Sequence, residues 1–145
     1  MYLIKLNNKI FRTTQGYLDK VLKEYDLSSG SYPYLLILKE NEGISQNKIS
    51  KELGYDKAMS ARTIIKLIEL GYLDRQEDEA DSRAYKLYLT EKAKVIIPKI
   101  LNEIHKLVNL ITVDLNEEEK IITIESLNKV LNNIKSIEIS SIKGE

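Results

Sequence analysis

Apolar residues recur every three or four positions through most of the chain, and this spacing predicts a mainly helical protein. A first helix is expected to run through about Tyr25, and a second one carries the apolar residues from Leu35 to Leu38. Between them, residues 26–31 are rich in serine and glycine, which predicts a break. The N-terminal part of the chain is therefore expected to form two helices.

The segment from Ile44 to Gly71 has the signals of two helices joined by a tight turn. Ser45 is a good N-cap for the first helix, and Gly54 can end it in the left-handed conformation that glycine tolerates. Asp56 can then cap the next helix, which we expect to end at Gly71. The segment therefore predicts a helix-turn-helix.

After Gly71 the apolar period changes from 3.6 to 2, which is typical of β-strands. Leu73 and Arg75 alternate with polar neighbours, and a second alternation runs from Tyr85 to Leu89. Residues 77–83 between them are polar, so the pattern predicts a β-hairpin with a long polar tip.

Two long helices are expected to complete the chain. Thr90 can cap the first, whose apolar positions run from Ala93 to Ile111. Asn116 as N-cap and Glu119 three residues later form a capping-box signature for the second, which fades near residue 139. A hairpin placed directly after a helix-turn-helix is a winged helix. We therefore expect one domain over residues 1–145, mainly α with a small β-hairpin wing, in which residues 30–90 form the winged helix-turn-helix lobe.

The helix after Asp56 is a candidate recognition helix for the major groove of DNA, where the base edges differ. On a helical wheel, Ser60, Thr63, Ile64 and Leu67 point toward the core, whereas Ala58, Arg62, Ile65, Lys66 and Glu69 point away. Arg62 therefore lies in the first half of the outward face, where it can donate two hydrogen bonds to guanine. The two lysines of this helix, Lys57 and Lys66, are better placed for phosphates. The amides at the start of the preceding helix, near Ser45 and Gln46, can also bind phosphate.

Two motifs resemble the MarR family of transcriptional regulators. The run from Gly54 to Arg62, followed by Leu67 and residues 71–75, is similar to the recognition helix of that family. Asp81-Ser82-Arg83, followed by Leu87-Tyr88-Leu89-Thr90, resembles its wing signature, Asp-x-Arg and then Leu-x-Leu-Thr. The family order of helices covers nearly the whole chain.

The resemblance implies a homodimer that binds double-stranded DNA at a pseudo-palindromic operator, with repression as the family default. Residues 1–25 and 91–139 would be the dimerisation helices. Asp81 would hold the hairpin together through a nearby arginine, and Arg83 would enter the minor groove. The residues expected at DNA are Ser45, Gln46, Lys57, Ala58, Met59, Arg62, Lys66, Arg75 and Arg83.

Relatives of this kind release DNA when a small aromatic or anionic effector binds between the dimer helices and the DNA-binding lobe. In this chain we expect such an effector near Lys9, Arg12, Tyr32 and Tyr34. The arginine could pair with a carboxylate, and the tyrosines could stack on a ring or donate hydrogen bonds to the compound.

Composition narrows the remaining choices. Cysteine is absent and His105 is the sole histidine, so we expect no disulfide and no zinc site, and we expect no cofactor. No long apolar run predicts a membrane span, and the start of the chain does not read as a signal peptide, so we expect a cytoplasmic protein. We find neither a phosphate-binding glycine loop nor a nucleophile elbow, so we expect no enzyme.

The charge pattern leaves one alternative open. The 22 basic and 22 acidic residues give no net charge, and residues 77–83 hold four acids and one arginine, a net of −3. Phosphates would repel such a wing tip. A winged-helix module that binds proteins and not DNA is therefore the alternative reading.

Overall fold

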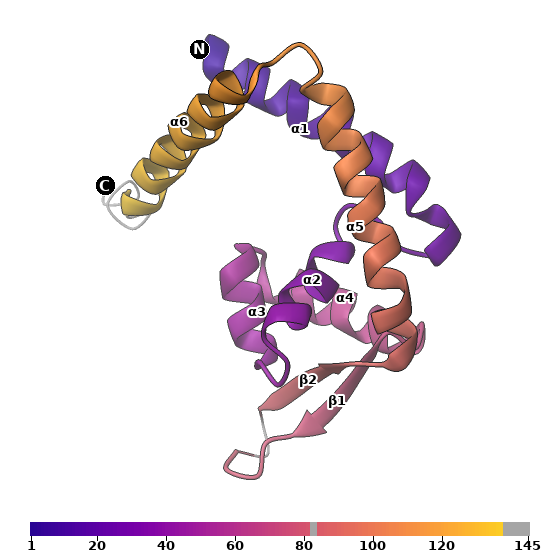
Figure 1. Ribbon diagram of the computed structural model, residues 1–145. Coiled ribbons are helices and arrows are strands. Elements are labelled where there is room, and N and C mark those ends of the chain that lie inside the picture. The colour runs from indigo at the N-terminus through magenta and orange to yellow at the C-terminus, as the bar shows by residue number, and fades with distance from the viewer. Residues whose placement is uncertain (82–83, 138–145) are drawn as a thin grey trace. The chain divides into compact units, whose positions relative to one another are not determined.

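The computed structural model describes residues 1–81 and 84–137. Six α-helices, one short 3₁₀ helix and a two-stranded hairpin make up these residues (Figure 1), which confirms the predicted fold class, mainly α with a β-hairpin. The elements are α1 (Tyr2–Val21), η1 (Lys23–Tyr25), α2 (Tyr32–Glu40), α3 (Gln46–Leu53), α4 (Lys57–Glu69), β1 (Leu73–Glu77), β2 (Tyr85–Leu89), α5 (Glu91–Ile111) and α6 (Glu117–Ser136).

The chain divides into two compact units, Met1–His105 and Lys106–Glu145. The first unit holds the helix-turn-helix and the hairpin, and the second holds α6. The expected assignment of residues 1–25 and 91–139 to dimerisation stays a prediction. In the described part of the chain, no helix combines the length and the apolar character that crossing a bilayer requires.

Side-chain caps fix where the central helices begin. The Ser45 hydroxyl accepts a hydrogen bond from the Lys48 amide at 3.2 Å, and the Asp56 carboxylate accepts one from the Met59 amide at 3.0 Å. Gly54 between them has a φ of 68°, the left-handed conformation that lets α3 end and the chain turn into α4. The predicted helix-turn-helix is therefore confirmed, including its caps.

The first helix changes character before it ends. The α-helix stops at Val21, and the chain continues to Tyr25 as the tighter η1 turn. The Tyr25 carbonyl accepts a hydrogen bond from the Tyr72 hydroxyl at 2.6 Å, which ties this turn to the start of the hairpin. Helical winding thus reaches Tyr25 as predicted, but its last turn is 3₁₀.

The hairpin is joined to the helix-turn-helix by its backbone. Strands β1 and β2 are antiparallel, with Leu73 opposite Leu89 and Arg75 opposite Leu87. On the other edge of β2, Leu87 accepts a hydrogen bond from the Gly43 amide at 2.9 Å and donates one to the Ile44 carbonyl at 3.1 Å. The residues before α3 therefore pair with the other edge of β2 through an isolated bridge, which the sequence pattern did not predict.

Gly43 makes that pairing possible. Its φ is +82°, and a Cβ atom there would lie 3.2 Å from the Tyr88 hydroxyl oxygen. An L-residue at this position would therefore meet both backbone strain and a steric contact.

The core of the first unit is centred on α2. Its buried side chains Tyr34, Leu35 and Leu38 belong to the same core as Ile49 of α3, Ile64 and Leu67 of α4, and Leu73 and Leu87 of the hairpin. One polar pair lies among them: the Tyr34 hydroxyl and the Ser60 Oγ are 2.8 Å apart, and both side chains are fully buried. This hydrogen bond joins α2 to α4.

We expect Tyr34→Phe to lower the free energy of unfolding by about 1–3 kcal/mol, because it leaves the Ser60 hydroxyl buried without its partner. The double variant Tyr34→Phe/Ser60→Ala should cost less than the sum of the two single changes, since neither polar group is then left alone. Denaturant titration at a fixed protein concentration measures both effects. Tyr17→Phe is the control, because no described residue hydrogen-bonds that half-exposed hydroxyl. Equal losses for Tyr34→Phe and the control would contradict the expectation.

Candidate nucleic-acid interface

Helix α4 exposes a face that carries charged side chains together with Ala58 and Ile65. Ala58, Arg62, Ile65, Lys66 and Glu69 are exposed, whereas Ser60, Ile64 and Leu67 on the opposite face are buried. Three of the four predicted core positions are thus buried, but Thr63 is only half-buried and lines a cavity. The exposed charges of α4 are Lys57, Arg62 and Lys66 against Glu69, a net of +2.

Capping and core packing together set the orientation of this face. The Asp56 carboxylate caps the first turn of α4, and Tyr34 anchors the same turn to the core through Ser60. At the other end, the carbonyl of Gly71 accepts a 2.6 Å hydrogen bond from the Thr90 hydroxyl, and Leu70 accepts one from the Lys92 ammonium. Arg62 therefore projects from a helix that is held at both ends.

The hairpin carries a second exposed arginine. The guanidinium carbon of Arg75 lies 4.2 Å from the centroid of the Tyr85 ring, on the diagonally opposite position of the neighbouring strand. A cation held over an aromatic face keeps its charge and its outward hydrogen-bond donors. Arg75 is exposed, and its predicted contact with DNA stays a prediction.

The wing tip is closed by its own hydrogen bonds. The Asp78 amide donates to the Ala84 carbonyl at 3.0 Å, and the Ala84 amide donates to the Asp81 carbonyl at 3.0 Å. The Asp78 side chain accepts from the Ala80 amide at 2.9 Å. Asp81 is exposed, and its predicted pairing with an arginine stays a prediction. Arg83 lies outside the described residues.

The start of α3 contributes less exposed surface. Ser45 and Gln46 are half-buried there, and an isolated bridge pairs Ser45 with Lys86 of β2. The structure thus places eight of the nine predicted contact residues on or beside α3, α4 and β1 of one unit; the ninth is Arg83.

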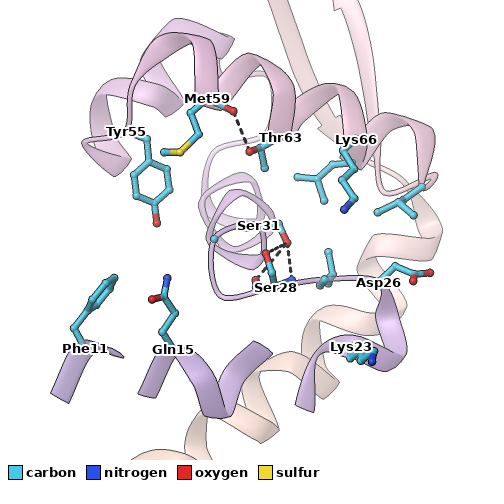
Figure 2. Close-up of a pocket in the computed structure, with 14 residues that line it drawn as sticks. Phe11, Gln15, Lys23, Asp26, Ser28, Ser31, Tyr55, Met59, Thr63 and Lys66 are labelled. Atoms are coloured by element: carbon cyan, nitrogen blue, oxygen red, sulfur yellow. Dashed lines mark hydrogen bonds between the residues drawn. The ribbon is translucent and has the colours of Figure 1, made fainter. Parts of the chain in front are cut away.

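A cavity of about 650 Å³ lies behind the exposed face of α4, within the first unit. Figure 2 shows Tyr55, Met59, Thr63 and Lys66 on one side, facing Phe11 and Gln15 of α1 and Lys23 of η1. Asp26, Ser28 and Ser31 close it from the loop before α2. The other lining residues are Leu27, Gly30, Leu67 and Leu70.

The chemistry of the cavity is mixed. Lys23 and Lys66 supply positive charge opposite a single carboxylate, Asp26, and the leucines and Phe11 supply apolar surface. Burial raises the pKa of the Tyr55 hydroxyl, and the nearby Tyr34 raises it further. Tyr55 is therefore neutral at ordinary pH and able to donate a hydrogen bond.

The four residues predicted at an effector site do not line this cavity. Lys9 and Arg12 are exposed on α1, and Tyr34 is buried against Ser60. Tyr32 is half-buried at the start of α2, where burial and then Tyr55 raise its pKa. Met59, Thr63 and Leu70 lie on the side of α4 that lines the cavity. Their helical spacing was the sequence signal that could have located it.

No group of histidine, cysteine, aspartate or glutamate side chains suited to a metal ion occurs among residues 1–81 and 84–137.

Comparison with known proteins shows which family has this sequence and this fold. The model of the MarR family matches residues 25–84, from the end of η1 through the hairpin tip. A solved MarR transcriptional regulator from Methanosarcina mazei Go1 is 31% identical, with a TM-score of 0.86 over 94% of this chain and 99% of that one. The chain belongs to the MarR family. The resemblance noted in the sequence is therefore confirmed.

Two further MarR-type comparisons are informative. The HTH-type transcriptional regulator BilQ of Clostridioides difficile (strain CD3) is 36% identical over 103 residues, which are 71% of this chain and 70% of that protein. A putative MarR family regulator from Listeria monocytogenes, solved in complex with a 26mer DNA, has a TM-score of 0.85 at 26% identity, covering 90% of this chain and 87% of that one. MarR-family proteins are transcriptional regulators and not enzymes, which confirms the expected class.

Proposed function

We propose that this MarR-family regulator is a repressor that binds a pseudo-palindromic operator in double-stranded DNA as a homodimer and is released by a small-molecule effector. The observation that carries the proposal is the exposed face of α4, with Arg62 in its first half and lysines on either side. The Listeria relative, whose structure contains DNA, supports the same use of this fold.

The exposed cations of α4 and β1 have two different roles in this proposal. The guanidinium of Arg62 reads guanine through two hydrogen bonds, which discriminates against a wrong base by about 1–3 kcal/mol. Lys57, Lys66 and Arg75 neutralise phosphates and supply affinity without sequence information. Because the wing tip is acidic, phosphate contacts are concentrated on α4 and on the base of the hairpin. Repression needs no further surface, since a dimer bound across an operator blocks other proteins sterically.

The dimer is supported by apolar surface in both units. The N-terminal half of α1 exposes Tyr2, Leu3, Ile4, Leu6, Ile10 and Phe11. Helix α6 exposes Ile121, Ile122, Ile124, Leu127, Val130, Leu131 and Ile134. Exposed apolar residues in this number are typical of interaction sites, and a second copy of the chain is the partner that a two-fold symmetric operator requires.

Release by an effector is supported by two residues that belong both to the exposed face of α4 and to the lining of the cavity. Met59 and Lys66 are exposed beside Arg62 on α4, and both also line the cavity. An anionic compound with an apolar ring fits its two lysines and its leucines. Such a compound would bind the Lys66 ammonium and thereby compete with a DNA phosphate for the same charge.

The alternative function is binding of a protein by the winged helix. The acidic wing tip, with Glu77, Asp78, Glu79 and Asp81 within five residues, is the observation that favours it. A basic protein surface would complement that tip.

Selection of bound duplexes from a random pool at low salt tests the main proposal. We expect a motif with two symmetric half-sites in successive major grooves, and affinity that falls steeply with added salt. Arg62→Ala should lose preference for one guanine per half-site by roughly 5- to 150-fold. Arg12→Ala, an exposed arginine of α1, is the control and should keep the motif. Failure to enrich any duplex would instead support the protein-binding alternative.

We expect Leu127→Glu to shift the chain from dimer to monomer in sedimentation, since it buries a charge in the proposed apolar contact. Operator affinity should fall with it. Asn132→Glu introduces the same charge away from the apolar stripe of α6 and should leave the dimer intact. A parent chain that sediments as a monomer at micromolar concentration would refute the dimer.

Effector release can be tested with benzoates and with the matching neutral benzamides. We expect benzoates to weaken operator binding and benzamides to do so far less, because only the carboxylate can pair with Lys23 and Lys66. Lys23→Met removes a cavity cation outside α4, so it should reduce the benzoate response while operator affinity stays unchanged. The same benzoate response in parent and Lys23→Met would exclude this cavity as the site.

A further inference from the structure

Ile65 is an apolar residue in the middle of the exposed face of α4. Of its surface, 49% is accessible, whereas its neighbour Ile64 is fully buried. Helix α4 therefore packs Ile64 and Leu67 into the core of the first unit and exposes Ile65 to solvent. A single exposed apolar residue is common on protein surfaces, so its significance depends on where it lies.

The position of Ile65 relative to Arg62 is fixed by helix geometry. Three residues correspond to a rotation of about 60° from the arginine and an axial rise of about 4.5 Å. Ala58 lies one turn before Arg62 on the same side of the helix. Its side chain is too small to hold the helix away from a surface. Arg62 and Ile65 therefore meet a common surface side by side, one with hydrogen-bond donors and the other with methyl groups.

The floor of the major groove offers one apolar group, the C5 methyl of thymine. Successive base pairs are about 3.4 Å apart. The axial offset of about 4.5 Å between the two side chains therefore lets them reach bases within about two base pairs of each other. Ile65 has no polar atom, so against cytosine it would cover the N4 amine without giving it a partner, which is unfavourable.

We propose that Ile65 is a specificity-determining residue that packs on a thymine methyl within about two base pairs of the guanine read by Arg62. This inference rests on the proposed function, because it assumes that α4 enters the major groove. It adds that each half-site is read by a polar contact and an apolar contact from adjacent turns of one helix.

The test uses the duplex that the full-length parent protein selects from a random pool. Each thymine of the selected half-site is replaced in turn by deoxyuridine, which removes only the C5 methyl group. We expect one position per half-site at which the parent loses about 4-fold in affinity, the value of one buried methyl group. With Ile65→Ala, affinity for the all-thymine duplex should fall, and deoxyuridine at that position should have no further effect.

Glu40→Ala is the control, because Glu40 is exposed at the end of α2, outside the α4 face and outside residues 1–25 and 91–139. It should keep the full deoxyuridine effect. Thermal unfolding of both variants at one protein concentration checks that they fold, and an exposed position should tolerate alanine with little loss.

The outcomes separate the inference from the function on which it rests. If the parent selects a duplex but no deoxyuridine substitution changes its affinity, Ile65 does not read thymine. The same follows if Ile65→Ala keeps the deoxyuridine effect of the parent at every position. If the parent selects no duplex at all, the proposed DNA-binding function itself is overturned, and the inference with it.

Discussion

The hydrogen bond between Tyr34 and Ser60 is the constraint on which the functional surface depends. It is made in the interior of the first unit, where both partners are fully buried and a misplaced partner would leave a polar group unsatisfied. Apolar packing around Ile64 and Leu67 already restricts how α4 can rotate or slide, and the hydrogen bond adds a directional constraint. This bond in the first turn of α4 favours one rotation of the helix, and that rotation decides which side chains point outward.

The same packing brings the exposed face of α4 close to the cavity behind it. The two surfaces share a helix that is only a few residues wide, so Met59 and Lys66 belong to both. Tyr55 connects the cavity to the interior, since its ring lies 6.0 Å from that of Tyr34. A compound in the cavity would therefore touch α4 directly and would not need a long chain of intermediate residues.

Most of the fold could be predicted because its boundaries are set by local chemistry. Ser45, Gly54, Asp56 and the Asn116–Glu119 capping box each act within a few residues, and the structure confirms them. The helical-wheel prediction of which α4 residues are buried was also largely right, because burial on one side of a helix follows from the helical period. Thr63 is the exception, since a cavity and not the packed core lies next to it.

The features that sequence reasoning missed depend on residues far apart in the chain. The pairing of Gly43 and Ile44 with Leu87 joins segments that have no common local signal. The cavity brings together α1, the loop before α2, and α4, so no single stretch of sequence could identify it. The tyrosines near the start of α2 looked suitable for a ligand, but Tyr34 is used by the core.

The close approach at Gly43 has an evolutionary consequence. A side chain at position 43 would make a tight contact of 3.2 Å with the hydroxyl of Tyr88 and would also need an unfavourable backbone conformation. Relatives that lose this glycine are therefore expected to have a smaller residue at position 88 or a rearranged joint between α2 and α3. The two positions should change together in descent, although 45 residues separate them in the sequence.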